Sequence, residues 1–412
     1  MTSRQQGRRA AVTGLGVVAP NGVGADAFWK ATRQGVSVLD RISREGCTGL
    51  PLRIAGQVNG FDPQSAIDNR FLVQTDRFTH YAMAAADLAV ADAGFRPDPE
   101  QPFAVGVVTA AGSGGGEFGQ RELQQLWGQG PKFVGPYQSI AWFYAASTGQ
   151  ISIRGGYKGP CGVVASDEAG GLDALAHAAR SIERGTDAVV VGAAEAPLAP
   201  YSMVCQLGYP EISLAEHAER AYLPFTEQAC GFSPAEGGAM LLLEDERTAR
   251  LRGASVRALL AGHAATFTGA SRWEESREGL AAAIRIAMDE ARVAPEEIDV
   301  VFADALGVPA ADRAEALALV DALGPTAEQV PVTAPKTGTG RAYCGAPMLD
   351  VAAAVLAMED GLVPPTPNVT KVCHDLALVT DRARPTELNT ALVLSRGLMG
   401  SNSALVLRRA QP

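Results

Sequence analysis

The stretch from Gly159 to Leu175, GPCGVVASDEAGGLDAL, constrains the fold of this chain more than any other. A short apolar run passes through a turn into an Ala-rich segment, which predicts a buried strand, a tight turn and a helix. Such an elbow holds a side chain against the free N–H groups and positive dipole of the helix start, and this activates a cysteine as a thiolate nucleophile. Here the turn carries Glu168, a poor nucleophile that can serve as an acid, a base or a hydrogen-bond acceptor.

The stretch resembles the active-site elbow of the β-ketoacyl synthases of the thiolase superfamily, whose pattern is GPxxxVSTxCxSGLDA. Gly159, Pro160, Val164 and the run Gly171 to Ala174 match, and Glu168 aligns with the nucleophilic cysteine. Within that superfamily the chain is most similar to the chain-length factors, or KSβ subunits, of bacterial type II polyketide synthases. Those subunits usually have a Gln at this position, followed by AGGLDAL, so this chain departs from them by carrying an acid.

The resemblance extends to the two blocks that hold the catalytic histidines of the synthases. In VVFADALGVPAAD, Asp304 stands where one histidine is expected, and PKTGTGRAYCGAP keeps Lys336 but has Arg341 in place of the other. Further blocks, among them VTGLGVVAPNGVG near the N-terminus and GLMGSNSALVLRR near the C-terminus, follow in the order of the family. Several ordered blocks over about 400 residues identify the chain as a member of this family.

No other residue replaces the missing chemistry. The cysteines lack CxxC spacing, and Cys161, on the predicted strand before the elbow, is expected to be a small buried core residue. The histidines match none of the catalytic blocks. The sequence therefore argues against an autonomous ketosynthase, predicts no metal site and no cofactor, and requires that condensation chemistry come from another chain.

The four substituted or retained positions suggest a structural role for the former active site. If they converge as their counterparts do in the family, Glu168, Asp304, Lys336 and Arg341 bring two acids and two bases together. We expect a charge-balanced plug, because an uncompensated member of a buried ion pair is costly. The alternative is a malonyl-acyl carrier protein decarboxylase, which makes the primer with Glu168, Asp304 and Lys336.

The resemblance also implies a substrate tunnel along TAAGSGGGEFGQRELQQLW, where chain-length factors receive the growing polyketide. The matching positions are Gly116, Gly119 and Leu123, which are spaced to share one helix face. Two glycines and a leucine on that face predict a roomy tunnel. Tyr201 is a further tunnel candidate. The competing interpretation is that residues 112–119 form a flexible loop whose glycines permit unusual backbone angles.

The resemblance implies an obligate heterodimer, because condensing enzymes of this fold work as dimers whose subunits contribute to each other's acyl pockets. The expected partners are a cysteine-bearing KSα ketosynthase and an acyl carrier protein that carries malonyl and polyketide chains. In that heterodimer this chain would be a noncatalytic subunit that sets polyketide length.

Composition excludes other classes of partner. With 47% hydrophobic and 19% charged residues, the 412-residue chain has the composition of a globular protein with a large core. A net charge of −10 argues against nucleic-acid binding. The N-terminus lacks the pattern of a signal peptide and no apolar run approaches ~20 residues, so no membrane association is expected. Unpaired cysteines favour a cytoplasmic location.

Short Val-rich and Ala-rich runs alternate with amphipathic stretches, which indicates a layered α/β protein. Strands are expected at 10–18, 104–109, 163–165, 188–192, 239–243, 256–266, 299–303 and 390–395, and helices at 75–92, 169–184, 278–291 and 348–358. The resemblance implies the thiolase fold, with two similar halves in a five-layer α-β-α-β-α architecture. The expected boundary lies near residue 250, with an N-terminal half at 1–250 and a C-terminal half at 251–412.

Overall fold

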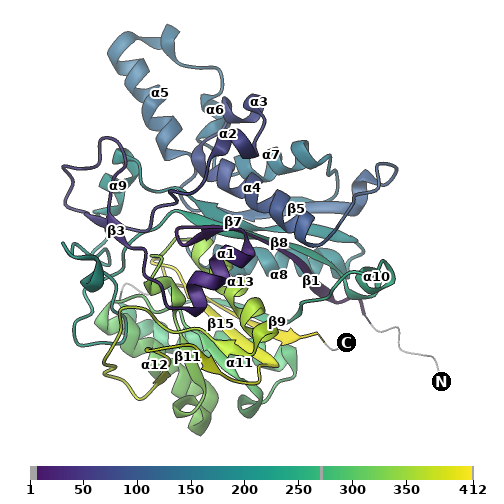
Figure 1. Cartoon of the computed structure of the whole chain (residues 1–412), viewed down its shortest axis with the longest axis vertical. Coiled ribbons are helices and arrows are strands. Elements are labelled where there is room, and N and C mark those ends of the chain that lie inside the picture. The colour runs from purple at the N-terminus through teal and green to yellow at the C-terminus, as the bar shows by residue number, and fades with distance from the viewer. Residues whose placement is uncertain (1–6, 270–271, 411–412) are drawn as a thin grey trace.

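The computed structural model describes residues 7–269 and 272–410 (Figure 1). Its centre is a twelve-stranded sheet, in which each half of the chain contributes five principal strands. The first half supplies β1 (Ala10–Ala19), β5 (Val105–Ala110), β6 (Cys161–Val164), β7 (Ala188–Glu195) and β8 (Gly237–Asp245). The second half supplies β9 (Ala258–Phe267), β10 (Val300–Phe302), β11 (Pro331–Thr333), β15 (Thr390–Arg396) and β16 (Ser401–Arg409). Short strands β2 (Gly22–Val23) and β13 (Ala377–Leu378) complete it.

The two halves repeat one topology. The strand order is β6-β5-β7-β8-β1 in the first half and β11-β10-β15-β16-β9 in the second. In each half three strands are parallel to one another and the last two are antiparallel. The halves join where β1 pairs with β9, in the register Ala11 with Leu259 and Val12 with Ala258. The prediction of two similar halves is confirmed, while the boundary at residue 250 stays a prediction.

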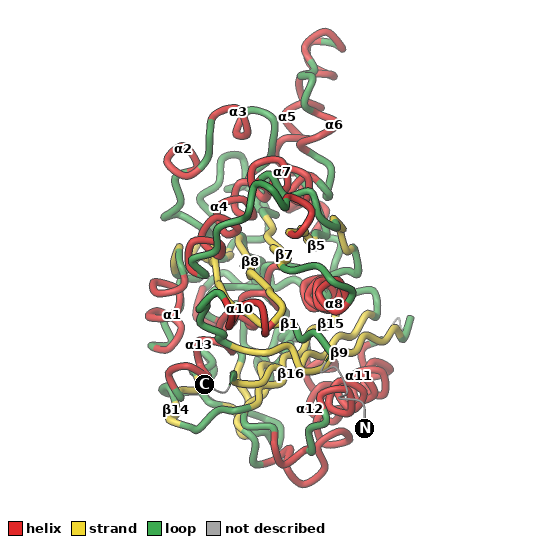
Figure 2. Tube along the Cα trace, turned by 90° about the vertical axis from the view of Figure 1, so that its right-hand side faces the viewer, coloured by secondary structure: helices red, strands yellow, loops and turns green. Residues whose placement is uncertain are grey.

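Helices cover both outer faces of the sheet and fill the space between the halves. On the outer side of the first half lie α4 (Arg77–Asp92) and α7 (Ala146–Gly155), and on that of the second lie α11 (Ser276–Ala291) and α12 (Pro309–Leu323). Between the halves lie α8 (Gly170–Glu183) and α13 (Gly345–Asp360), as the side view shows (Figure 2). Residues 345–358 of α13 are all buried, as expected for a helix with apolar residues on every side. The five-layer α-β-α-β-α thiolase fold is therefore confirmed.

The remaining elements lie around these layers. The other helices are α1 (Ala25–Arg33), α2 (Pro63–Ala66), α3 (Asn69–Leu72), α5 (Gly116–Gln129), α6 (Gln138–Ala141), α9 (Pro200–Gln206) and α10 (Glu246–Leu251). Two small antiparallel ribbons pair β3 (Asp40–Arg41) with β4 (Ile54–Ala55) and β12 (Leu362–Val363) with β14 (Arg384–Pro385). Helix α5 projects away from the body of the molecule (Figure 1).

Two expectations about the region before the site need correction. Cys161 is exposed rather than buried, because β6 is the last strand of the sheet and, among the described strands, pairs with β5 alone. A loop over residues 112–119 is also wrong beyond Gly115, since α5 begins at Gly116. Within that loop Gly114 has a φ of 67°, a value that glycine adopts at little cost.

Within the two described ranges, no helix combines the length and apolarity that a membrane crossing requires.

Candidate functional site

The site forms where the carboxyl ends of two sets of parallel strands face each other. Because β5, β6 and β7 are parallel, the segments that follow them meet at one edge and bring Gly112, Glu168 and Glu195 together. In the second half β10, β11 and β15 are parallel, so Asp304 and Lys336 follow their strands to the same edge. Each half therefore delivers half of the site.

The predicted elbow lies between the end of β6 and the start of α8. Asp167 occupies the left-handed region with a φ of 55°, a conformation that Asp tolerates better than most residues. Its carboxylate accepts a hydrogen bond of 2.8 Å from the main-chain N–H of Met399. The next residue, Glu168, is only 1% exposed. The elbow thus holds a carboxyl group where the family pattern has its nucleophile.

Arg341 joins the two acids that the sequence predicts at the site. Its Nε donates to Oε2 of Glu168, and its Nη2 donates to Oδ1 of Asp304 at 2.7 Å. Nη2 and Nη1 also donate to the main-chain oxygens of Arg396 and Asp304, at 2.8 and 3.0 Å. The main chain at 341 is itself held, since its N–H donates to the carbonyl of Ser233 at 2.8 Å. Arg341 fills the space of the expected histidine with a fixed cation.

Two residues that sequence reasoning missed extend this network. Arg396 donates from Nε to Oδ2 of Asp304 at 3.1 Å and from Nη2 to Oε2 of Glu315 at 2.9 Å. Glu315 in turn accepts the main-chain N–H of Asp304 at 2.7 Å. Burial alone would raise the pKa of Asp304, but the charges of Arg341 and Arg396 outweigh it and lower that pKa to about 2.

Lys336 belongs to the cluster but does not face the carboxylates of Glu168 or Asp304. Its Nζ lies 2.5 Å from Oδ2 of Asp350 and donates to the carbonyl oxygens of Ala303 and Asp304, at 2.9 and 3.2 Å. Sequence analysis expected two acids and two bases. The structure adds Asp350, Glu315 and Arg396, so the cluster holds four carboxyl groups against three cations.

Glu168 is a member of the cluster whose carboxyl pKa departs from its ordinary value. Burial raises its pKa to about 7, in spite of the opposing charge of Arg341. Only Oε2 is used by Arg341, and within the described residues Oε1 is buried without a hydrogen-bond partner. A buried oxygen without a protein partner is uncommon in folded proteins, so Oε1 is an acceptor that a ligand or a water molecule can use.

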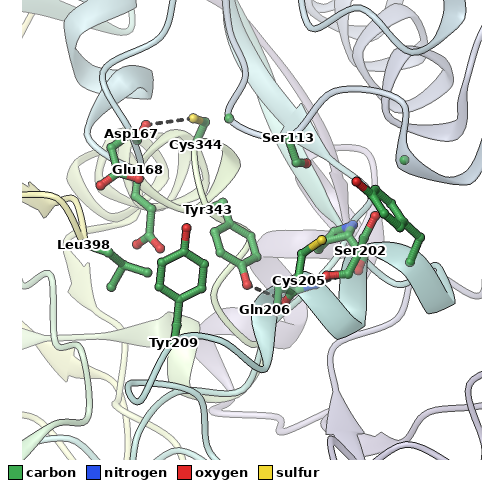
Figure 3. Close-up of a pocket in the computed structure, with 14 residues that line it drawn as sticks. Ser113, Asp167, Glu168, Ser202, Cys205, Gln206, Tyr209, Tyr343, Cys344 and Leu398 are labelled. Carbon is green, nitrogen blue, oxygen red and sulfur yellow. Dashed lines mark hydrogen bonds between the residues drawn. The ribbon is translucent and has the colours of Figure 1, made fainter. Parts of the chain in front are cut away.

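A cavity of about 250 Å³ lies beside Glu168 (Figure 3). It is lined by Gly112, Ser113, Gly116, Asp167, Glu168, Pro197, Tyr201, Ser202, Cys205, Gln206, Tyr209, Tyr343, Cys344 and Leu398. Two of the tunnel candidates, Gly116 and Tyr201, are in this lining, whereas Gly119 and Leu123 are not. A Cβ at Gly119 would lie 3.6 Å from the Cβ of Trp142, and Leu123 is 41% exposed. Of the four cluster positions that the sequence predicts, only Glu168 borders the cavity.

Glu195, at the end of β7, holds the wall of this cavity in place. Its carboxylate is fully buried and accepts the N–H of Gly112 at 2.5 Å and the hydroxyl of Ser113 at 2.9 Å. Burial raises its pKa even though these hydrogen bonds oppose the shift. The loop before α5 is therefore tied to the sheet.

Cys344 is the thiol nearest to the elbow, but it does not replace the nucleophile. Its Sγ donates to the carbonyl of Asp167 at 2.9 Å, and the residue is buried. Burial first, and the charges of Glu195 and Glu168 next, raise the pKa of this thiol well above its ordinary value, so the thiolate is disfavoured. Among the described residues no group of three or more His, Cys, Asp and Glu side chains could hold a metal ion.

Of the site residues that sequence reasoning missed, one could have been found from its position in the sequence. Arg396 ends the apolar run TALVLSR directly before a glycine-containing turn, and an arginine at the end of a buried strand predicts a buried acid nearby. Glu315 and Asp350 each lie in an Ala-rich helix that carries two other acidic residues, with no spacing that marks them.

Replacing Glu168 by Ala is expected to lower the free energy of unfolding by about 3 kcal/mol, because Nε of Arg341 loses its buried acceptor. Glu168→Gln keeps an oxygen for Arg341 and should cost about 1 kcal/mol. Urea unfolding measures both, with Glu117→Ala as a control that removes only the exposed ion pair with Arg77. Equal stability of the wild type and Glu168→Ala would contradict a structural role for the pair.

The raised pKa of Glu168 predicts a pH dependence of stability. Its pKa is about 7 in the folded chain, against an ordinary value of 4.5 for glutamate, so the folded state binds more protons between these values. The free energy of unfolding should therefore fall as pH rises from about 5 to about 7. Glu168→Gln lacks this titration, so its stability should depend less steeply on pH in that window. Parallel pH profiles of the two proteins in urea unfolding would show that Glu168 titrates elsewhere.

Comparison with known proteins gives the same assignment as the motifs. The β-ketoacyl synthase N-terminal domain model matches residues 7–249, and the C-terminal domain model matches residues 257–370. A polyketide β-ketoacyl synthase 2 of Streptomyces coelicolor is 72% identical over 403 residues, which cover 98% of this chain and 95% of the relative.

Two further proteins are similar over nearly their whole length. The tetracenomycin polyketide synthase ketoacyl synthase β subunit of Streptomyces glaucescens is 51% identical over 402 residues, covering 97% of this chain and 98% of the relative. The solved structure of the ishigamide ketosynthase/chain length factor has a TM-score of 0.86 and 27% sequence identity, covering 98% of this chain and all of that one. The chain therefore belongs to the β-ketoacyl synthase family.

Proposed function

We propose that this chain is the chain-length factor subunit of a type II polyketide ketosynthase. The observation that carries the proposal is the elbow: the synthase scaffold is present, but the nucleophile position holds Glu168, bound to Arg341 in a buried ion network. The names of the relatives support this role, since they describe a synthase 2, a β subunit and a ketosynthase/chain length factor. The condensation itself is then the work of a KSα partner with the complete Cys and His set.

Two surface features support pairing with that partner. Strand β6 has one free edge within the described sheet, and free edges are sites where another chain can add. Helix α5 and the segment that follows also expose a cluster of large apolar side chains, and such a patch marks a protein interface. The members of this cluster are Trp127, Phe133, Trp142, Phe143 and Tyr144. We propose that the KSα ketosynthase covers the cluster and the edge.

In this heterodimer, the acyl carrier protein supplies malonyl groups and carries the growing chain. We propose that the chain extends into a tunnel bounded by α5 and α9, where Gly116 and Tyr201 line the cavity and Gly119 and Leu123 lie further along α5. The volume left by the glycines then sets how many units fit. The division into halves at residue 250 and a cytoplasmic location belong to the same proposal.

The decarboxylase alternative is less well supported by the geometry. It needs Glu168, Asp304 and Lys336 to act together on a malonyl group. Asp304 is held between Arg341 and Arg396, and the ammonium group of Lys336 lies against Asp350. Neither Asp304 nor Lys336 borders the cavity, so only Glu168 could reach a substrate there.

Co-expression of this chain with a KSα ketosynthase of a type II polyketide synthase tests the function. We expect a one-to-one complex that condenses malonyl-acyl carrier protein, while this chain alone neither condenses nor releases carbon dioxide. Size-exclusion chromatography and product mass spectrometry measure both. Carbon dioxide release by the chain alone would favour the decarboxylase, and elongation by it would overturn both functions.

Filling the cavity at Gly116 should shorten the product. A Cβ at Gly116 would lie 2.1 Å from Oγ of Ser202, so Gly116→Phe is best made together with Ser202→Ala, which removes that clash. We expect the double variant in the complex to make polyketides shorter than those of Ser202→Ala alone. Gly128→Ala on the same helix, where no atom lies within 4 Å of the new Cβ, is the control. An unchanged product distribution would contradict the role of Gly116.

A further inference from the structure

Two polar atoms outside the network described above border the cavity: Oε1 of Glu168 and the hydroxyl oxygen of Tyr209. Figure 3 shows the hydroxyl of Tyr209 pointing toward the carboxylate of Glu168, with Leu398 beside them. Tyr209 follows α9, and its N–H donates to the carbonyl of Gln206 at 2.9 Å, which positions it at the cavity. The other tyrosine nearby, Tyr343, is engaged differently, because its hydroxyl donates to Oε1 of Gln206.

Oε1 of Glu168 is an acceptor that the fold leaves without a donor. Arg341 occupies Oε2, and within the described residues Oε1 has no hydrogen-bond partner although the residue is 1% exposed. Leaving a buried acceptor unpaired is unfavourable, so a ligand that supplies a donor gains binding free energy. The phenol of Tyr209 adds a donor on the opposite side of the same space.

We propose that this cavity binds the enol form of a 1,3-dicarbonyl group, the repeating unit of a poly-β-ketone chain. The enol O–H donates to Oε1 of Glu168, and the neighbouring carbonyl oxygen accepts from the hydroxyl of Tyr209. That a poly-β-ketone is the natural source of this group rests on the proposed function. The site itself rests on the two side chains and the cavity between them.

The hydrogen-bonding groups and the charge of the site favour the enol over the diketone form and over an anionic ligand. A diketone without an enol proton has two acceptors and leaves Oε1 unpaired, whereas the enol form carries one donor and one acceptor on a single conjugated unit. In free solution these two groups hydrogen-bond to each other, and in the site Oε1 of Glu168 and the hydroxyl of Tyr209 replace that internal bond. An anionic group such as malonate would place a second negative charge beside Glu168, whose counterion Arg341 is already shared with Asp304. A neutral enol makes a charge-assisted hydrogen bond with the ionised carboxylate instead.

The size of the cavity matches a short segment of such a chain. About 250 Å³ lies below the roughly 300–1,000 Å³ of pockets that hold drug-sized ligands. One or two ketide units therefore fit beside Glu168. The side chains of Leu398 and Tyr343 border the same space and can pack against the flat conjugated unit.

The test uses the purified complex with KSα at pH 8 and 2,4-pentanedione as the probe. The matched control is 3,3-dimethyl-2,4-pentanedione, because this compound cannot form the conjugated enol. Proton NMR of the probe measures binding and the ratio of enol to ketone. We expect the probe to bind at least about tenfold more tightly than the control and its enol fraction to rise when the complex is added.

A pair of tyrosine variants tests the contribution of Tyr209 to binding. Tyr209→Phe removes only a hydroxyl from a half-exposed side chain, so it should fold normally and weaken the probe by about tenfold. Tyr137→Phe, a similarly exposed tyrosine outside the cavity lining, should leave binding unchanged. Equal binding of the two diketones, or unchanged binding by Tyr209→Phe, would overturn the inference.

The outcome separates this inference from the proposed function. A complex that condenses malonyl units but shows no selectivity for the enolisable diketone disproves the enol site and leaves the chain-length role intact. A complex that fails to condense but binds the enol through Tyr209 supports the site and rejects its proposed origin.

Discussion

The guanidinium group of Arg341 is the contact on which the rest of the site depends. It joins Glu168, delivered by the first half of the chain, to Asp304, delivered by the second, in the interior between the two halves. An arginine stays protonated even when it is buried, so its presence requires carboxylates around it. Glu168 and Asp304 meet that requirement, and Arg396 with Glu315 surrounds Asp304 from the other side. The three substituted positions therefore form one electrostatic unit.

This unit explains why a scaffold built for a nucleophile can be stable without one. At the same elbow, a cysteine would find a cation in the place of a base, and the removal of one charged group would leave its partners uncompensated. The residues at 168, 304 and 341 compensate one another's charges, so a substitution at one of them removes a charged partner of another. Their consequence is a site whose interior is held rigidly, while one carboxylate oxygen remains free toward a cavity.

The cavity is shaped by a second set of contacts, independent of the ion network. Glu195 ties the loop before α5 to the end of β7, and Gln120 accepts the N–H of Tyr201, which joins α5 to α9. The wall that carries Gly116 is thus set by hydrogen bonds from both sides. Because different contacts hold the charged interior and the cavity wall, residues of the wall can change the size of the cavity without disturbing the ion network.

Local patterns were sufficient to predict much of this molecule. The alternation of strand and helix patterns and the ordered motifs predicted the layered fold, the elbow at Glu168 and the positions of Asp304, Lys336 and Arg341. The pattern also predicted eight of the ten principal strands, because buried runs and their turns are local properties of the chain, but it missed β11 and β16. It did not reveal that Cys161 is exposed, since an edge strand and a central strand have the same apolar sequence.

By itself, then, the sequence determined that Glu168, Asp304 and Arg341 stand where the pattern of the family has a cysteine and two histidines. Only the tertiary structure decided how those residues pair. Lys336 turns to Asp350, Arg341 bridges two acids, and Arg396 joins from a strand far along the chain. It also decided that Gly116 and Tyr201 share a cavity with Glu168 while Gly119 and Leu123 do not. The physical reason is that ion pairs and cavities depend on distances between segments that only the packing of the two halves sets.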